Sequence, residues 1–363
     1  MSTAAPHAPP TRVILENDTS RGRRWRWLPW WIAGISLVVA ASAVAANARY
    51  FQKQGALAER WHSLSKEAPN KVAIVDVVGA IMGGDGFARR QIEQVADDES
   101  VKALVLRVDS PGGTVAGSDE LHHRLAKLVE KRSLPVVVSM GSIAASGGYY
   151  VAMANGGRED VIYAEPATLT GSIGVIIPHY DVSRALKRFD VADDSITSGP
   201  LKEMLSPTKE RAPELAERER KVLQALVDDM FARFKEVVRG GRPKLDDAAL
   251  DAVATGQVFT ATQAREAGLV DRIGFLEDAV ERAVELAGLT KDTARVVRYE
   301  RPRGLLDEIL GVDVAAAVRG TAPARGPAEA LLPRSVLDAF VEWTTPRPWY
   351  LCTWWPAILS SGP

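Results

Sequence analysis

Ser146 lies in a run of small residues whose composition suits a nucleophile. The run, Gly141–Gly148, follows an apolar segment predicted as a strand over Val136–Met140. Small neighbours let a peptide carbonyl approach the hydroxyl, and a helix beginning at Gly147 would present N–H groups to a developing oxyanion. A tight packing turn is the more common meaning of an isolated Ser-Gly-Gly. The motif therefore makes Ser146 a candidate and leaves that alternative open.

A second glycine motif, Asp109–Gly113, follows the apolar segment Ala103–Val108 and precedes another predicted helix. Taken alone it is a turn signal, because proline fixes φ and glycine permits positive φ. Its position at the carboxyl end of a predicted strand adds weight, since ligands of open α/β sheets bind at that end. The backbone N–H of Gly113 is therefore a candidate donor for an oxyanion hole.

No histidine is an evident base for Ser146. Two histidines lie in the N-terminal tail or just past the apolar segment that follows it, two lie on a predicted helix and one lies in a loop. None of them has an evident orienting carboxylate. The five are His7, His62, His122, His123 and His179.

A lysine can take the place of histidine when burial disfavours its ammonium form. Moving a lysine pKa from ~10.4 to near 7–8 corresponds to about 4 kcal/mol of differential solvation, so a catalytic lysine should lie among apolar side chains. Lys202 has Leu201, Met204 and Leu205 beside it. An exposed surface role is nevertheless the default for a lysine, and these neighbours alone do not select it.

The segments that must position these residues alternate between short apolar runs and helical patterns. Apolar strands that alternate with helices predict βαβ units and a parallel sheet, and hence an α/β fold. The predicted strands are Val72–Val77, Ala103–Val108 and Val136–Met140, the predicted helices are Phe87–Glu99, Ser118–Lys131 and Ala212–Arg239, and Val296–Tyr299 is expected to add an edge strand.

The N-terminal part of the chain predicts a membrane anchor. Residues 28–46 carry no charge, and about 19 residues at 1.5 Å each approach ~30 Å, the thickness of the hydrocarbon core. Arginines and tryptophans precede this segment, which places the N-terminus in the cytoplasm and exports the rest of the chain. A cleavable signal peptide is the alternative, because small-residue sites lie within residues 41–48.

The chain is expected to divide into five regions, and no internal repeat doubles the catalytic unit. The tryptophan-rich end is expected either to lie in a membrane interface, to fill a groove of another subunit, or to fold onto its own domain. The regions are a disordered cytoplasmic tail over 1–27, a transmembrane helix over 28–46, a linker over 47–70, a catalytic domain over 71–300 and an extension of uncertain structure over 301–363.

Composition excludes several classes of protein. The formal net charge of −1, with 45 basic and 46 acidic residues, gives no global attraction to nucleic acid. The single cysteine, Cys352, excludes an internal disulfide and disfavours a cysteine-ligated structural metal. The fold must therefore be stabilised by its apolar core.

Taken together, the motifs resemble those of the signal peptide peptidase A family (peptidase family S49), whose members are Ser/Lys membrane proteases. Each motif is weak alone, but jointly they are highly specific, and the resemblance covers roughly residues 71–287. The matching segments are Ser110–Gly113, Ser142–Tyr150, Leu169–Val175, the segment around Lys202, Gly256–Phe259, Gln263–Ala264 and Gly268–Asp271.

The resemblance implies a Clp-protease/crotonase-like fold and assigns a role to each site residue. By position, Ser146 is the nucleophile, Lys202 the general base and Ser172 the residue that orients the lysine amine. The amides of Gly113 and Gly147 form the oxyanion hole. No metal or cofactor is implied. In the short, single-repeat form of the family a neighbouring subunit contributes the lysine, which implies a ring-like homo-oligomer with a shared active site.

The function that the resemblance implies is an endopeptidase that degrades cleaved signal peptides and other hydrophobic peptides at the membrane. Its location would be the bacterial inner membrane, with a single membrane pass and the catalytic domain in the periplasm. Three alternatives stay open: a related protease with other membrane-associated substrates, a crotonase-like acyl-CoA enzyme and a non-catalytic scaffold. The chain departs from the family's usual pattern at two places. The turn over residues 155–160 looks longer than usual, and Leu201 stands where family members often carry another residue.

Overall fold

A computed structural model describes residues 34, 36, 57–83, 86–300 and 349–351. The chain divides into two units, Met1–Ala56 and Leu57–Pro363. The predicted transmembrane segment 28–46 lies outside the described residues, apart from Gly34 and Ser36, which are helical. Among the residues that the structure describes, no helix combines the length and the apolar character needed to cross a bilayer.

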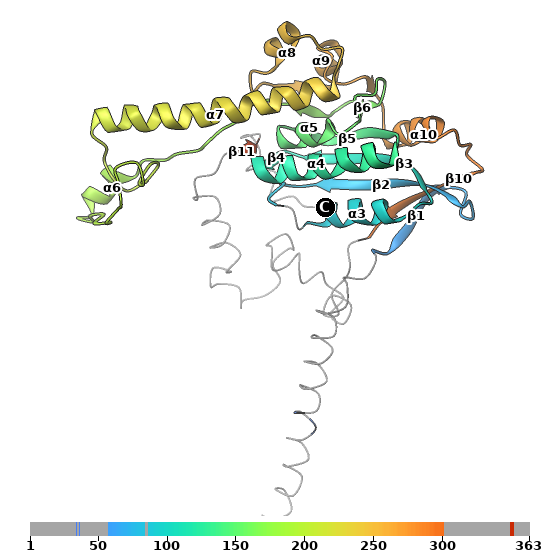
Figure 1. Cartoon of the computed structure of the whole chain (residues 1–363), viewed down its shortest axis with the longest axis horizontal. Helices are drawn as coiled ribbons and strands as arrows, with labels where there is room; N and C mark the ends of the chain where they lie inside the picture. The colour runs from blue at the N-terminus through green and yellow to red at the C-terminus, as the bar shows by residue number, and fades with distance from the viewer. Residues whose placement is uncertain (1–33, 35, 37–56, 84–85, 301–348, 352–363) are drawn as a thin grey trace, which may run out of the picture. The chain divides into compact units, whose positions relative to one another are not determined.

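The second unit is built on a central sheet of nine strands (Figure 1). Strands β10, β2, β3, β5, β6 and β9 pair in this order and are all parallel, while β1 is antiparallel to β10. Strand β7 pairs in parallel with the carboxyl-terminal residues of β5, and β8 is antiparallel to β7. The bounds are β1 Glu59–Leu64, β2 Asn70–Val78, β3 Val101–Ser110, β5 Val136–Ala145, β6 Ile162–Ala164, β7 Leu169–Gly171, β8 Val258–Thr260, β9 Arg272–Ile273 and β10 Ala294–Tyr299.

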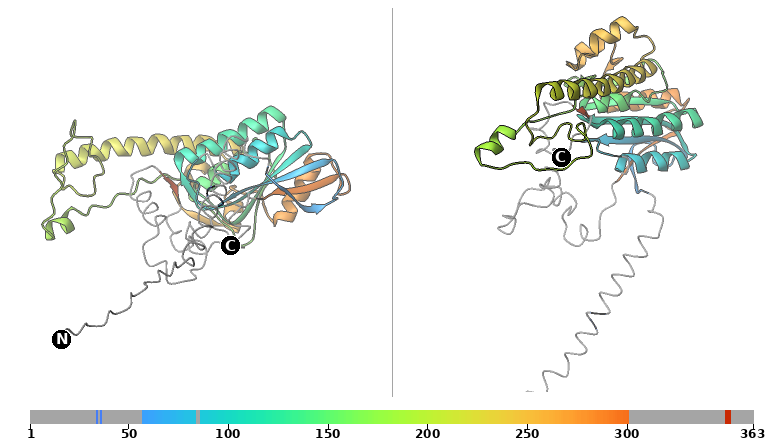
Figure 2. Two further views of the ribbon diagram at one scale, coloured as in Figure 1. Left: turned by 90° about the horizontal axis from the view of Figure 1, so that it is seen from below. Right: turned by 60° about the vertical axis from the view of Figure 1, so that its left-hand side comes forward.

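The central strands are buried on both faces because helices cover both sides of the sheet (Figure 2). Most residues of β2, β3 and β5 are buried, as expected when the apolar runs of parallel strands are covered twice. Helix α10 packs across β2, β3, β5 and β6, while α3 packs on β2 and on α4. The predicted α/β architecture with parallel strands is confirmed, and it fits a Clp-protease-like fold.

The helices begin and end where local chemistry favours it. Helix α4 begins after Thr114, whose hydroxyl accepts a hydrogen bond from the Gly117 N–H at 3.1 Å, a capping contact that satisfies an otherwise unpaired donor. It ends at Arg132, and the next residue, Ser133, adopts a left-handed conformation. The bounds are α3 Phe87–Asp97, α4 Val115–Arg132, α5 Gly147–Ala152, α6 Ser183–Arg188, α7 Pro213–Gly241, α8 Asp247–Val253, α9 Ala261–Glu266 and α10 Leu276–Leu286.

Helix α7 is only partly packed on the sheet unit. It has 29 residues, a length of about 44 Å at 1.5 Å per residue. Four of its five buried residues lie in its C-terminal part, between Phe234 and Gly241, and the fifth is Glu219. The N-terminal part extends away from the sheet and carries residues 175–212, which we call the arm (Figure 1).

Three features differ from the sequence prediction or add to it. The strand at Val296–Tyr299 is present, but it is not an edge strand, because β1 pairs on its outer side. Strand β1 itself lies within the segment predicted as a linker. The C-terminal extension contributes β11, Trp349–Leu351, which pairs antiparallel with β4, Gly112–Thr114.

Candidate active site

Ser146 occupies a tight turn between β5 and α5. Its backbone has φ 54° and ψ −117°, a sparsely populated conformation that costs a non-glycine residue about 1–3 kcal/mol. The residue is 1% exposed and its amide donates to the Gly171 carbonyl at 2.8 Å. Among the described residues, nothing hydrogen-bonds to the hydroxyl. The turn thus places a buried residue with an unengaged hydroxyl at the carboxyl end of a central strand.

Gly147 and Gly113 lie against each other. A Cβ atom added to Gly147 would come within 3.1 Å of the Gly113 nitrogen and within 2.3 Å of the Ser118 Oγ. Gly147 is also the first residue of α5, where N–H groups have no partner within the helix. The two amides expected to form an oxyanion hole are therefore close together, beside Ser146.

The Gly113 position also admits no side chain. A Cβ there would lie 1.9 Å from the carbonyl oxygen of Ile81, because residue 81 forms a bridge with Gly113 and accepts a hydrogen bond from Thr114. The preceding Gly112 has a φ of 102°, which favours glycine. The Pro-Gly-Gly motif thus leads into strand β4, and this strand places the Gly113 amide against Gly147.

Ser172 follows β7 just as Ser146 follows β5. The parallel register pairs Ala145 with Gly171, so the two serines extend adjacent strands, whose spacing is about 4.8 Å. Both are buried, and both have a positive φ. The structure therefore brings together four of the five predicted site residues: Ser146, Ser172, Gly113 and Gly147.

Lys202 is not brought to this cluster within one chain. It is exposed on the arm, and its ammonium has no hydrogen-bond or ion-pair partner among the described residues. The arm is tied to α7 through Glu219, whereas α5 meets α7 at Phe234, where Tyr150 makes an edge-on ring contact. Glu219 and Phe234 are 15 positions apart on α7 (234 − 219), which is about 22 Å along the helix axis.

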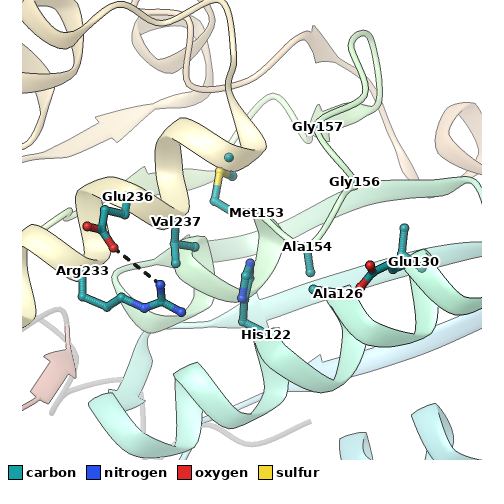
Figure 3. Close-up of a pocket in the computed structure, with 12 residues that line it drawn as sticks. His122, Ala126, Glu130, Met153, Ala154, Gly156, Gly157, Arg233, Glu236 and Val237 are labelled. Carbon is teal, nitrogen blue, oxygen red and sulfur yellow. Dashed lines mark ion pairs between the residues drawn. The ribbon is translucent and has the colours of Figure 1, made fainter.

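A pocket of about 480 Å³ lies between α4, the end of α5 and α7 (Figure 3). None of the five predicted site residues lines it. His122 does, and it packs edge-on against Tyr150 with ring centroids 5.3 Å apart. Burial lowers the pKa of His122 to about 4, so its imidazole is neutral at pH 7. Because none of the predicted site residues lines the pocket, it is separate from Ser146.

Two features of the site were missed by sequence reasoning. Ser118 on α4 is fully buried against Gly147, and its hydroxyl has no partner among the described residues. The pairing of β11 with β4 places Tyr350 opposite Gly113 in the register. No local pattern could reveal either feature, because both depend on segments distant in sequence. The described residues also contain no cluster of three or more His, Cys, Asp or Glu suited to a metal ion.

Comparisons with known proteins point to peptidases. Residues 129–290 match the model of peptidase family S49. The chain is 40% identical over 243 residues to a putative protease, slr0021, of Synechocystis sp., covering 67% of this chain and 84% of that protein. It is 37% identical over 267 residues to a putative signal peptide peptidase SppA of Enterococcus faecium, covering 70% and 74%. Protease 4 of Haemophilus influenzae is 36% identical over 235 residues, which are 62% of this chain and 36% of that protein.

Proposed function

Because this chain belongs to peptidase family S49 and is therefore a serine-type peptidase, we propose that it hydrolyses peptide bonds with a Ser146/Lys202 dyad completed between protomers. The observation that carries the proposal is the cluster around Ser146. A strained, buried serine at the end of β5 lies beside Gly113, Gly147 and Ser172. That cluster supplies a nucleophile and oxyanion donors but no base.

In the proposed mechanism the neutral Lys202 amine takes the proton of Ser146 as the serine oxygen attacks the peptide carbonyl. The Gly113 and Gly147 amides stabilise the negative oxygen of the tetrahedral intermediate. The lysine then donates the proton to the departing amine, which leaves an acyl ester on Ser146. Water, deprotonated by the same lysine, hydrolyses this ester and regenerates the serine.

A neighbouring protomer is the proposed source of the lysine. Lys202 is exposed and has no partner among the described residues, and several apolar side chains elsewhere on the arm are exposed as well. Burial of these side chains against a second copy would desolvate the ammonium and favour the neutral amine. The contact repeated around a closed ring would complete every site. The exposed apolar residues of the arm are Ile176, Tyr180, Val182, Phe189, Val191 and Ile196.

The proposed substrates are extended hydrophobic peptides of the signal-peptide class. Strand β4 carries Gly113 and accepts the antiparallel strand β11, which supports binding of an extended chain by strand addition. The uncharged segment 28–46 would anchor the enzyme in the bacterial inner membrane, with residues 71–300 acting as a periplasmic protease domain near such peptides. Membership of a peptidase family disfavours acyl-CoA chemistry and a scaffold role.

The test is peptide hydrolysis by the full-length protein and two variants. Ser146→Ala is expected to lower kcat/KM at least about 10³-fold, and Lys202→Ala about 10²–10⁴-fold. Lys187→Ala is the matched control, because Lys187 lies on the same arm and only pairs with the exposed Glu210. Full activity of either catalytic variant would refute the dyad.

A fluorophosphonate probe gives a second readout on the same proteins. It should label the wild type at Ser146 and leave Ser146→Ala unlabelled, since the probe forms a bond only with an activated serine. Labelling at another serine would assign the nucleophile elsewhere.

A further inference from the structure

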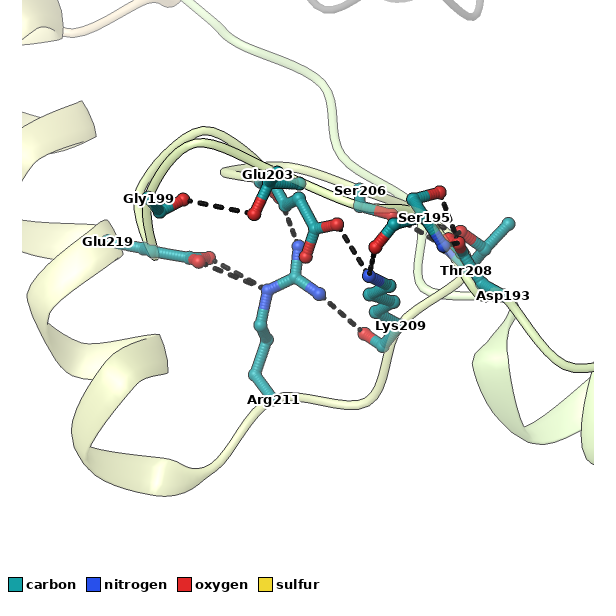
Figure 4. Close-up of polar contacts among 10 residues, drawn as sticks. Asp193, Ser195, Gly199, Glu203, Ser206, Thr208, Lys209, Arg211 and Glu219 are labelled. Carbon is teal, nitrogen blue, oxygen red and sulfur yellow. Dashed lines mark hydrogen bonds and ion pairs between the residues drawn. The ribbon is translucent and has the colours of Figure 1, made fainter.

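A polar network holds the turn that carries Lys202 (Figure 4). Arg211 lies at its centre. Its Nε donates to both carboxylate oxygens of Glu219 at 3.1 and 3.2 Å, its Nη1 donates to the Lys209 carbonyl at 3.0 Å, and its Nη2 donates to the Glu203 carbonyl. One guanidinium thus joins helix α7 to the backbone on both sides of Ser206.

The anchor of this network is a buried carboxylate. Glu219 is 6% exposed, and it is the only buried residue in the part of α7 that extends away from the sheet. Burial of a carboxylate is costly unless a cation and hydrogen bonds compensate it. Arg211 provides both, with its own side chain 14% exposed. The pair therefore fixes the arm to α7 at one defined point.

The Glu203 carbonyl belongs to the residue directly after Lys202. It also accepts the Ser206 N–H at 2.9 Å, while the Lys202 N–H donates to the Gly199 carbonyl at 3.0 Å. These bonds close the turn on both sides of Lys202. The backbone is fixed, and the lysine side chain is left without a partner in the described part of the chain.

The second lysine of the segment is used differently. Lys209 pairs with the Glu203 carboxylate and donates to the Ser195 carbonyl at 3.1 Å. Its ammonium is thus held in place by two contacts within the arm, which makes it unsuitable as a base for a serine elsewhere. The network therefore distinguishes the two lysines. Lys209 makes structural contacts within the arm, whereas the side chain of Lys202 remains available to another protomer.

We propose that Arg211, held by Glu219, is a positioning residue that fixes the geometry from which Lys202 reaches the serine of a neighbouring protomer. This inference rests on the proposed function, in which Lys202 is the base. The planar fork of arginine matches the two carboxylate oxygens and two carbonyls at once, and a lysine in its place cannot satisfy them all.

The first test compares kcat and KM of Arg211→Met, Arg211→Lys and Glu219→Gln in the full-length protein. Displacement of a catalytic group by about 1 Å costs on the order of 10²-fold in rate, so kcat is expected to fall roughly 10- to 100-fold in both arginine variants. KM should stay within about twofold, because peptide binding by strand addition involves β4. Glu219→Gln, which keeps the shape, should lose less.

Arg239→Met is the matched control. Arg239 lies at the other end of α7 and pairs with the exposed Asp247, so the same substitution removes an ion pair of the same helix. It should retain wild-type kcat. If Arg239→Met lost as much activity as Arg211→Met, or if Arg211→Met were fully active, the positioning role would be refuted.

A complementation test excludes a merely structural effect. Arg211→Met is co-expressed with Ser146→Ala or with Lys202→Ala under two affinity tags, and mixed oligomers are purified. With Ser146→Ala, sites that combine an intact serine with a well-positioned lysine form again, and activity should recover. With Lys202→Ala it should not. Equal recovery in both mixtures would overturn the inference.

The outcome for the inference is separable from that for the shared site. Mixed oligomers of Ser146→Ala and Lys202→Ala report on sharing itself, independently of Arg211. If they stay inactive, the lysine acts within its own chain, and kcat alone tests the positioning role of Arg211. A fall in kcat in Arg211→Met but not in Arg239→Met upholds that role, and an unchanged kcat in Arg211→Met refutes it.

Discussion

Ser146 keeps a positive φ between a strand and a helix, and the residues around it have small side chains or none. Strain of this kind persists only where surrounding contacts determine the backbone. Here the amide is bonded to Gly171, the carbonyl accepts from Tyr150, and Gly147 lies against Gly113. Ser146 is thus held by its backbone, and its hydroxyl stays available.

The close contact at Gly147 gives the first residue-scale prediction. Gly147→Ala would place a methyl group 2.3 Å from the Ser118 Oγ and 3.1 Å from the Gly113 nitrogen. Relief of the overlap must separate the two amides, so we expect a loss of about 10²-fold or more in kcat and of about 1–3 kcal/mol in the free energy of unfolding. Kinetics and denaturant unfolding measure both.

Gly240→Ala is the control for that variant. Gly240 is helical, and a Cβ there would meet nothing within 4 Å. Since alanine favours a helix over glycine by about 1 kcal/mol, this variant should keep its activity and be slightly more stable. Unimpaired catalysis by Gly147→Ala would contradict the proposed oxyanion hole.

At the residue scale, partners within one motif could be predicted from the sequence, and contacts between distant segments could not. Gly147 directly follows Ser146, whereas Gly113 lies in a second motif 33 positions earlier (146 − 113), and only the structure shows the contact between the two motifs. Ser172 followed from the family pattern, and its register beside Ser146 depends on the pairing of β7 with β5. The Arg211–Glu219 pair was not predicted, because a single arginine and a single glutamate eight positions apart (219 − 211) carry no distinctive pattern.

At the scale of elements, α7 has two different parts. Phe234 is fully buried and packs edge-on against Tyr150 with ring centroids 5.1 Å apart, whereas Leu226 on the same helix is 45% exposed. The C-terminal part thus fixes the helix to the sheet unit. The N-terminal part supports the arm.

This difference predicts unequal effects of two truncations of apolar side chains. Phe234→Ala should lower the free energy of unfolding by about 3–5 kcal/mol, the usual cost of emptying an aromatic core position. Leu226→Ala should cost less than about 1 kcal/mol under conditions where the protein is monomeric. Chemical denaturation followed by circular dichroism measures both, and similar losses would contradict the packing described for α7.

Strand β11 occupies the edge of β4 beside Gly113. If extended substrates use the same edge, β11 competes with them from within the chain, where its effective concentration is high. A chain ending at Arg347 should therefore show a KM for an extended peptide several-fold lower than that of the full chain. A chain ending at Leu351 keeps β11 and serves as the control. An equal KM for all three proteins would show that substrates bind elsewhere.

Elements with a long apolar pattern were predicted, whereas strands of two or three residues were not. Strands β2, β3 and β5 and helices α3, α4 and α7 have apolar patterns long enough to reveal their period. Strands of two or three residues, such as β4, β7 and β9, carry no such period. Strand β1 was missed because its partner is β10, so that Glu59 pairs with Tyr299 at the other end of the domain.

At the scale of the whole molecule, the exposed arm is the main departure from a self-contained enzyme. Ile196 is 99% exposed, Phe189 79% and Tyr180 77%, which is unusual for large apolar side chains of a stable monomer. The same arm carries Lys202, which the Ser146 cluster lacks. Both facts support the proposal that the arm packs on a second copy and completes its active site.

The central claim is tested most directly by the peptidase activity of mixed oligomers of Ser146→Ala and Lys202→Ala. Each variant alone should be inactive. If the dyad is shared, random assembly pairs an intact serine with an intact lysine at roughly one site in four, so the mixture should regain about a quarter of wild-type activity.

The matched control mixes wild type with a chain that carries both substitutions. A shared dyad predicts the same recovery, roughly a quarter, whereas a dyad within one chain predicts about half for this control and none for the mixture of single variants. Recovery in both mixtures at similar levels is the result that this account predicts. An inactive mixture of Ser146→Ala and Lys202→Ala, beside a control at about half of wild-type activity, would contradict it.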